Sequence, residues 1–251
     1  MRTLWAIAIA LLVAALGCPA DAAELKVLSG NGGKAAVREL ARRFEQASGH
    51  KVTVHFEVNA ALKQKIEAGE PFDVAVLNPP PLDALIKEGK IVADTRAVIG
   101  RIGIGLGVRA GAPKPDISSV EAFKRTLLGA KSVAYPGRGA SGVYFASLVD
   151  RLGIAAEMKP KMRPMPAEDT VEVVARGEAD LVVVVASRIY GVPGVELVGL
   201  IPKELQTFIG FAAGVGSAAK EPEAARAMVR FFTAPEAAEV LKPIGIEPFV
   251  E

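Results

Sequence analysis

Short apolar runs alternate with amphipathic stretches in the part of the chain that follows residue 22. The runs have the length and composition of buried strands, whereas the stretches between them space their apolar residues as one helix face requires. Strands and helices that alternate in this way are typical of a parallel sheet with helices on its faces. The predicted strands are Leu25–Leu28, Val52–Phe56 and Asp73–Leu77. Three helices are predicted between and after them: one with Val37, Leu40, Ala41 and Phe44 on its apolar face, one at Ala60–Ala68 and one at Leu82–Lys87.

The pattern changes at Ile102–Val108, where glycines interrupt a longer strand, and a second strand-and-helix set follows. Another long strand, Thr207–Val215, comes after that set. Two such sets joined by two long strands predict a two-lobed α/β fold in which the last helices return to the first lobe. We predict one lobe from residues 23–104 and 206–251 and the other from residues 105–205. The elements predicted here are strands Ser132–Tyr135, Met162–Met165 and Leu181–Val185 and helices Pro222–Phe232 and Pro235–Leu241.

The N-terminal residues have the three parts of a secretory signal peptide. Arg2 supplies a positive charge, Leu4–Leu16 is an apolar run too short to span a bilayer, and Ala20–Ala22 fits a cleavage site. We therefore expect a signal peptide at residues 1–22 and a periplasmic mature protein. Two alternatives stay open, a buried N-terminal helix and a lipoprotein cleaved before Cys18.

Composition excludes several classes of function. Lys and Arg number 30 against 28 Asp and Glu, and no basic cluster indicates nucleic-acid binding. The single Cys and two His exclude a disulfide framework and leave little room for a metal site. No run after residue 22 is long enough to cross a membrane. We expect no metal and no cofactor.

The loop Ser29–Lys34 follows a predicted strand and opens a helix. Glycines let backbone N–H groups approach a ligand closely, and a helix N-terminus carries partial positive charge. Lys34 adds a full charge. The loop predicts an anion site, and an ordinary strand-to-helix turn is the alternative. The candidate contacts are Asn31, Gly32, Gly33 and Lys34.

A second glycine-rich loop, Pro136–Gly142, precedes a helix expected to begin near Val143 and matches the G-x-G-x-x-G pattern. A dinucleotide site also needs an acidic residue about 20 positions on, to hold the ribose. The next predicted strand contains no acid, so we favour an oxyanion or carboxylate ligand. The candidate contacts are Arg138, Ser141 and Gly142.

Three further polar residues follow predicted strands. Thr170 lies in Pro166–Thr170, which opens a helix expected to run to Arg176, and it either contacts the ligand or belongs to a cap. Arg188 follows the valine-rich strand and faces either the cleft or solvent. Asn78 either lines the cleft or starts the next helix. No nucleophile signature is present.

Six stretches of the chain carry a resemblance to a known family: Lys26–Phe44, Ile66–Val76, Gly142–Tyr144, Leu152–Gly153, Ala167–Asp169 and Phe231–Gly245. They resemble periplasmic solute-binding proteins of the molybdate-binding type. The resemblance implies a type II periplasmic-binding-protein fold, an anion in the interlobe cleft and an inner-membrane ABC-type permease as partner. The chain departs from the family where Gly32, Asn59 or Ala60, and Val185 stand in place of hydroxyl donors. Lys34, Arg138 and Arg188 add cations, which favour a carboxylate over molybdate.

The sequence leaves several functions open for this protein. The first is a binding protein that delivers a small organic (poly)carboxylate to the permease. The second is an isomerase on the same scaffold, because aconitate isomerases resemble this family; its candidate bases are Glu57, Glu168 and Lys34. Molybdate or tungstate binding, and a sensory role without transport, are weaker alternatives.

Overall fold

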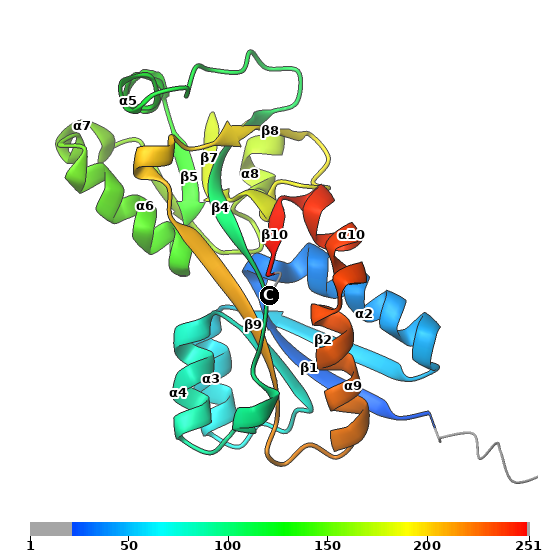
Figure 1. Ribbon diagram of the computed structural model, residues 1–251. Coiled ribbons are helices and arrows are strands. Elements are labelled where there is room, and N and C mark those ends of the chain that lie inside the picture. The colour runs from blue at the N-terminus through cyan, green and yellow to red at the C-terminus, as the bar shows by residue number, and fades with distance from the viewer. Residues whose placement is uncertain (1–21, 250–251) are drawn as a thin grey trace, which may run out of the picture.

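The computed structural model describes residues 22–249. The predicted signal peptide, with Cys18, therefore lies outside the described residues except for Ala22. The strands form one curled mixed sheet in the order β2-β1-β3-β9-β4-β7-β5-β6, and β10 and β8 also pair with β4. Figure 1 shows this sheet running through the length of the molecule. The strands are β1 (Glu24–Gly30), β2 (Lys51–Glu57), β3 (Val74–Leu77), β4 (Ala97–Arg109), β5 (Val133–Pro136), β6 (Met162–Met165), β7 (Leu181–Val185), β8 (Val195–Leu200), β9 (Phe208–Val215) and β10 (Ile246–Pro248).

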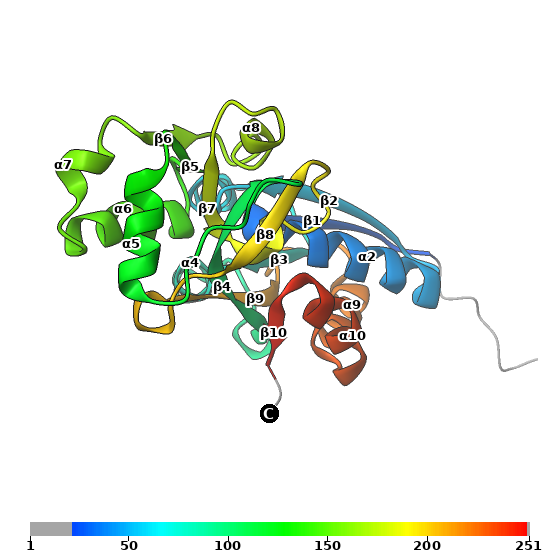
Figure 2. The ribbon, with the colours of Figure 1, turned by 90° about the horizontal axis from the view of Figure 1, so that it is seen from above.

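Helices cover the sheet on both faces. Figure 2 shows α5, α6 and α7 around β5, with α2, α9 and α10 grouped near β1 and β10. The helices are α2 (Lys34–Ser48), α3 (Asn59–Glu67), α4 (Pro79–Lys87), α5 (Val120–Gly129), α6 (Ala140–Arg151), α7 (Ala155–Met158), α8 (Glu172–Ala175), α9 (Pro222–Thr233) and α10 (Ala238–Leu241), with short 3-10 turns such as η1 (Asn31–Gly33) and η3 (Ala186–Arg188).

The period-two alternation of the strands decides which helices cover which face. Val27, Val74 and Val76 join the core cluster that contains residues of α2 and α9. Leu28 and Leu77 point the other way and pack with residues of α3 and α4. The helical stripe predicted on 34–48 is confirmed, because Val37, Leu40, Ala41 and Phe44 are all buried.

One strand belongs to both parts of the sheet. The first half of β4 pairs with β9 as far as Gly103, and from Ile104 onward β4 pairs with β7. Gln206 supports this change of partner, since its Oε1 accepts from the Ile104 N–H at 2.8 Å and its Nε2 donates to the Ile104 carbonyl at 2.9 Å. The predicted residue boundaries of the two lobes stay a prediction.

Three predicted helix boundaries are wrong. Helix α4 begins at Pro79 rather than Leu82, because proline in a first helical turn removes only N–H groups that have no partner there. Helix α6 begins at Ala140 rather than Val143, because Gly139 takes φ +131° and turns the chain into the helix. The segment from Pro166 is helical only over α8, because the Thr170 hydroxyl donates to the Pro166 carbonyl and favours a turn.

Asp73 is a buried carboxylate that ties distant segments together. Its side chain is 4% exposed, and it accepts from the backbone N–H groups of Lys26 at 2.8 Å and Lys220 at 2.9 Å. A longer contact joins it to the Glu221 N–H at 3.4 Å. The carboxylate thus fixes β1 against β3 and holds the segment that leads into α9.

We predict that Asp73→Ala lowers the free energy of unfolding by about 2–3 kcal/mol, because it leaves buried N–H donors without their charged acceptor. Urea unfolding followed by circular dichroism measures the change. Asp94→Ala is the matched control: the Asp94 side chain is 70% exposed and pairs only with Arg226, so its loss costs at most about 0.5 kcal/mol. Equal stability of the two variants would contradict the assignment.

Candidate functional site

The two glycine-rich loops border one cleft. Asn31 and Lys34 from the first loop, and Gly137 and Arg138 from the second, line a cavity of about 630 Å³. We call it the charged cavity. Its remaining lining residues are Phe56, Glu57, Val58, Pro164, Met165, Pro166, Ala167 and Glu168.

Two further cavities adjoin the charged cavity, and Val58 and Arg138 line all three. The inner pocket, of about 60 Å³, lies among polar and apolar groups from both loops. The apolar cavity, of about 720 Å³, extends along α4, α6 and β9. The inner pocket is lined by Asn31, Gly32, Val58, Asn59, Asn78, Pro136, Arg138, Gly139, Ala140, Ser141, Ala167, Val184, Val185, Arg188 and Ile209.

The start of α6 presents backbone donors to the inner pocket. The first N–H groups of a helix have no acceptor within the helix, and here Ala140 and Ser141 line the pocket. Gly142 has a steric role instead, because a Cβ there would lie 1.7 Å from the Pro136 carbonyl oxygen. Only glycine lets this helix start so close to the end of β5.

Two asparagines hold each other at the ends of β2 and β3. The Asn59 Oδ1 accepts from the Asn78 N–H at 2.9 Å, and the Asn78 Nδ2 donates to the Gly210 carbonyl at 2.8 Å. Both side chains line the inner pocket and the apolar cavity. Asn78 therefore lines the cleft and also immediately precedes α4.

Arg188 is one of two cations that line the inner pocket, and Arg138 is the other. One guanidinium nitrogen donates to the Ala167 carbonyl at 2.6 Å, and no acidic side chain within residues 22–249 lies at ion-pairing distance from it. Burial lowers the pKa of Arg188 below its usual value. The negative charges of Glu172 and Glu168 partly offset this lowering. A guanidinium has five N–H donors, so most of its capacity is open to a ligand.

Lys34 and Arg138 complete the positive side of the cleft. Neither forms an ion pair with an acid in the described part of the chain. Burial, then Arg188 and Arg38, hold the pKa of Lys34 below its usual value. The Lys34 Nζ lies 5.8 Å from the centroid of the Phe56 ring, within the range of a cation–π contact.

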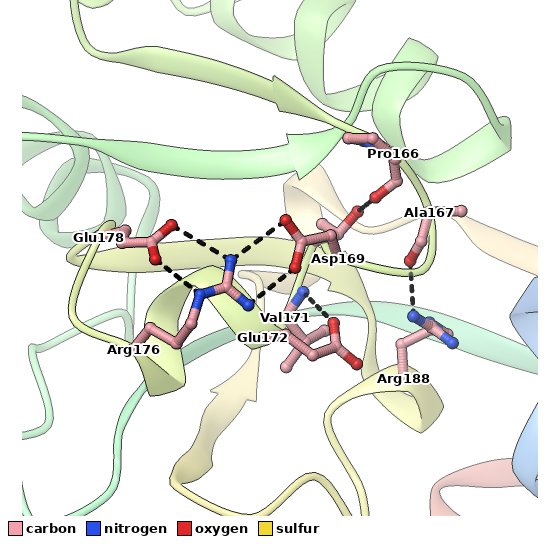
Figure 3. A network of polar contacts seen from close by, with 9 residues as sticks. Pro166, Ala167, Asp169, Val171, Glu172, Arg176, Glu178 and Arg188 are labelled. Atoms are coloured by element: carbon pink, nitrogen blue, oxygen red, sulfur yellow. Dashed lines mark hydrogen bonds and ion pairs between the residues drawn. The ribbon is translucent and has the colours of Figure 1, made fainter.

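A surface ion-pair network anchors the turn beside Arg188 (Figure 3). Arg176 donates to Asp169 at 2.9 and 3.1 Å and to Glu178 at 2.6 Å. The hydrogen bonds from Arg176 hold the pKa of Asp169 below its usual value. The anchored turn presents the Ala167 carbonyl to Arg188.

At the floor of the cleft, the turn η1 after β1 contacts the turn η3 after β7. The Ser187 hydroxyl donates to the Gly32 carbonyl at 2.7 Å, which joins η3 to η1. A Cβ at Gly32 would lie 3.1 Å from the Phe211 ring and 3.8 Å from the Val185 side chain. Apolar groups thus occupy the space beside Gly32.

The structure brings eight of the eleven predicted contacts to the cleft and leaves three away from it. Gly33 is buried against Phe211 and Val37, Gly142 has the steric role described above, and Thr170 is fully buried with its hydroxyl bound to Pro166. These three line none of the cavities. The residues that sequence reasoning missed are mainly apolar wall residues, which carry no chemical signal: Val58, Pro136, Val184 and Ile209. The predicted contacts that line the cleft are Asn31, Gly32, Lys34, Asn59, Asn78, Arg138, Ser141 and Arg188.

Comparison with known proteins identifies the family. Residues 25–247 match the family described as bacterial extracellular solute-binding protein. The chain belongs to this family. Membership implies a small ligand, an ABC-type permease as partner and a periplasmic location, as the sequence predicted. No helix within residues 22–249 has both the length and the apolar character needed to cross a membrane.

Individual relatives confirm the predicted resemblance and fold class. An aconitate isomerase from Pseudomonas sp is 37% identical over 89% of this chain and 87% of its own length. The molybdate-binding protein ModA of Azotobacter vinelandii is 28% identical over 94% of this chain and 95% of its own. A solved structure of the periplasmic molybdate-binding protein of that organism aligns with a TM-score of 0.76 at 18% identity, covering 90% of this chain and 100% of that one.

We predict that Lys34 is acetylated faster than Lys63 by limiting acetic anhydride at pH 8. The pKa of Lys34 is lowered by burial and neighbouring cations, so more of its amine is neutral and nucleophilic. The pKa of Lys63 is raised by hydrogen bonds with Glu67 and Glu88. Peptide mass spectrometry measures both sites in one sample. Equal labelling of the two lysines would show that the cleft does not perturb Lys34.

Proposed function

We propose that the cleft binds a di- or tricarboxylate and that the protein delivers it to an ABC-type permease. The observation that carries this proposal is the Arg188 guanidinium, which faces the inner pocket without an acidic partner among residues 22–249. Leaving a half-buried cation unpaired is costly, so a bound anion stabilises it. A carboxylate matches the planar donor pairs of a guanidinium.

The volume of the inner pocket is suited to one carboxylate group beside Arg188. A water molecule takes ~30 Å³ of liquid volume, so about 60 Å³ admits a group of two or three heavy atoms. Its polar neighbours are the amides of Asn31, Asn59 and Asn78 and the start of α6. Among residues 22–249, Ser141 alone contributes a side-chain hydroxyl to its lining. A tetrahedral oxyanion held by hydroxyl donors is therefore less well served than a carboxylate.

The charged cavity supports a second carboxylate. It is about ten times larger than the inner pocket, and Lys34 and Arg138 both line it. Arg138 lines both spaces, so it is placed to contact either group of one ligand. A ligand with two or three carboxylates uses these cations together, whereas a monocarboxylate leaves part of the positive charge uncompensated.

Calorimetry with citrate, trans-aconitate, succinate, molybdate and sulfate tests the proposal. We expect a polycarboxylate to bind best, and Arg188→Gln and Arg138→Ala each to weaken it roughly 10- to 150-fold, since a charge-assisted hydrogen bond contributes about 1.5–3 kcal/mol. Arg163→Ala is the control, because Arg163 is exposed on β6 and lines none of the three cavities. Tight molybdate binding without carboxylate binding would overturn the proposal.

A second candidate function is isomerisation of a bound tricarboxylate. The 37% identity to an aconitate isomerase favours it, and Glu168 and Lys34 line the same cavity. Moving a double bond along the carbon chain requires a base that removes a proton from the adjacent methylene carbon and a donor that returns it at the other end. Cations on the carboxylates stabilise the negative charge that develops.

Of the three bases predicted from the sequence, Glu57 is the least suitable. Its carboxylate hydrogen-bonds Lys65 and His55, and these contacts hold its pKa below the usual value. Glu168 forms no ion pair within the described part of the chain. Its negative charge acts on Lys34, whose pKa it raises. Glu168 is therefore our choice as the base.

An ultraviolet assay of cis- and trans-aconitate interconversion tests this second function. We expect Glu168→Gln to reduce turnover at least 100-fold, because a general base typically contributes 10²- to 10⁴-fold, while binding of aconitate is retained. Glu157→Gln on α7 is the control, since Glu157 is exposed and outside the three cavities. Absence of turnover by the wild-type protein at high concentration would remove this function and leave the binding function standing.

A further inference from the structure

The apolar cavity differs in chemistry from the rest of the cleft. Arg138 is the one charged residue among its described lining, whereas the charged cavity also has Lys34, Glu57 and Glu168. Its walls come from the three prolines at the start of α4, from alanines of α3, and from Val143, Phe208 and Ile209. Asn59, Gln64 and Asn78 are the uncharged amide residues on this lining, and most of the remaining wall offers hydrocarbon contacts.

The apolar wall includes two exposed apolar side chains, of which one, Phe208, is stacked against a cation. Val143 is 66% exposed and Phe208 is 41% exposed. The Arg101 guanidinium carbon lies 4.4 Å from the centroid of the Phe208 ring, and the Arg101 Nε donates to Glu247 at 2.7 Å. The ring is thus fixed by a stacked cation that is itself held by an acid. A fixed aromatic surface loses little conformational entropy when a ligand contacts it.

The apolar cavity adjoins the inner pocket. Asn59, Asn78 and Ile209 line both spaces, as does Arg138. A carboxylate beside Arg188 therefore has a hydrocarbon-lined space next to it. No step of carboxylate binding uses this space, and at about 720 Å³ it is larger than such a group requires.

We propose that the apolar cavity is a subsite for the hydrocarbon part of the ligand, so that the ligand class is a di- or tricarboxylate with an apolar substituent. The inference rests on the proposed function, because the carboxylate fixes where the substituent begins. Phe208 and Val143 then determine specificity by covering the substituent, and Arg101 acts as a positioning residue for the Phe208 ring.

Calorimetry with succinate, butylsuccinate and hexylsuccinate tests the subsite. We expect affinity to rise about threefold to fourfold for each methylene that the cavity buries, the gain typical of removing a CH₂ group from water. Phe208→Ser lowers this gain per methylene. Leu200→Ser preserves it, because Leu200 is a comparably exposed residue, at 45%, that lines none of the three cavities.

The outcomes separate this inference from the proposed function. Equal affinities along the series would overturn the subsite and leave carboxylate binding intact. Failure of every carboxylate to bind, citrate and aconitate included, would overturn the proposed function and the subsite with it. A wild-type gain per methylene in Phe208→Ser would overturn the role of the Phe208 ring toward the ligand.

Discussion

A half-buried guanidinium without an acidic partner in the described chain sets the chemistry of this molecule. Arg188 donates to one backbone carbonyl and lines a pocket whose described lining contains no carboxylate. The more exposed Arg176, by contrast, is paired with Asp169 and Glu178 (Figure 3). The difference is physical: an exposed ion pair is worth little, whereas an uncompensated charge in a narrow pocket strongly favours an anionic ligand.

The fold supplies this arrangement through a strand shared by two parts of the sheet. Because β4 changes partner between Gly103 and Ile104, the carboxyl ends of β1 and β5 and the loops that follow them border the same cleft. The Ser187–Gly32 hydrogen bond and the Phe211 ring close the floor between them. The anchored turn then sets the Ala167 carbonyl against Arg188. Binding groups thus come from backbone positions far apart in sequence.

The two proposed functions, binding and isomerisation, use the same cleft and differ only in whether a base acts on the bound anion. Both require several cations, and both are consistent with relatives that include an aconitate isomerase and molybdate-binding proteins. The surroundings of Gly32 differ from those of a site built of hydroxyl donors. Apolar groups fill the space into which a side chain at position 32 would extend. Proteins that share a fold differ in function through the residues that line the site rather than through the fold itself.

The sequence by itself determined most of the strands, the helix stripes and the two glycine-rich loops, because period-two and helical spacing and glycine's backbone freedom are local properties. It did not predict β8 or β10, which are short strands that both pair with β4. It also indicated the cations Lys34, Arg138 and Arg188, whose charge needs no tertiary context. Only the tertiary structure decided that Thr170 turns its hydroxyl to Pro166, that Gly142 is required by the Pro136 carbonyl, and that Val58 and Phe208 form walls. Burial, close approach and cavity shape depend on segments distant in sequence, and no local pattern records them.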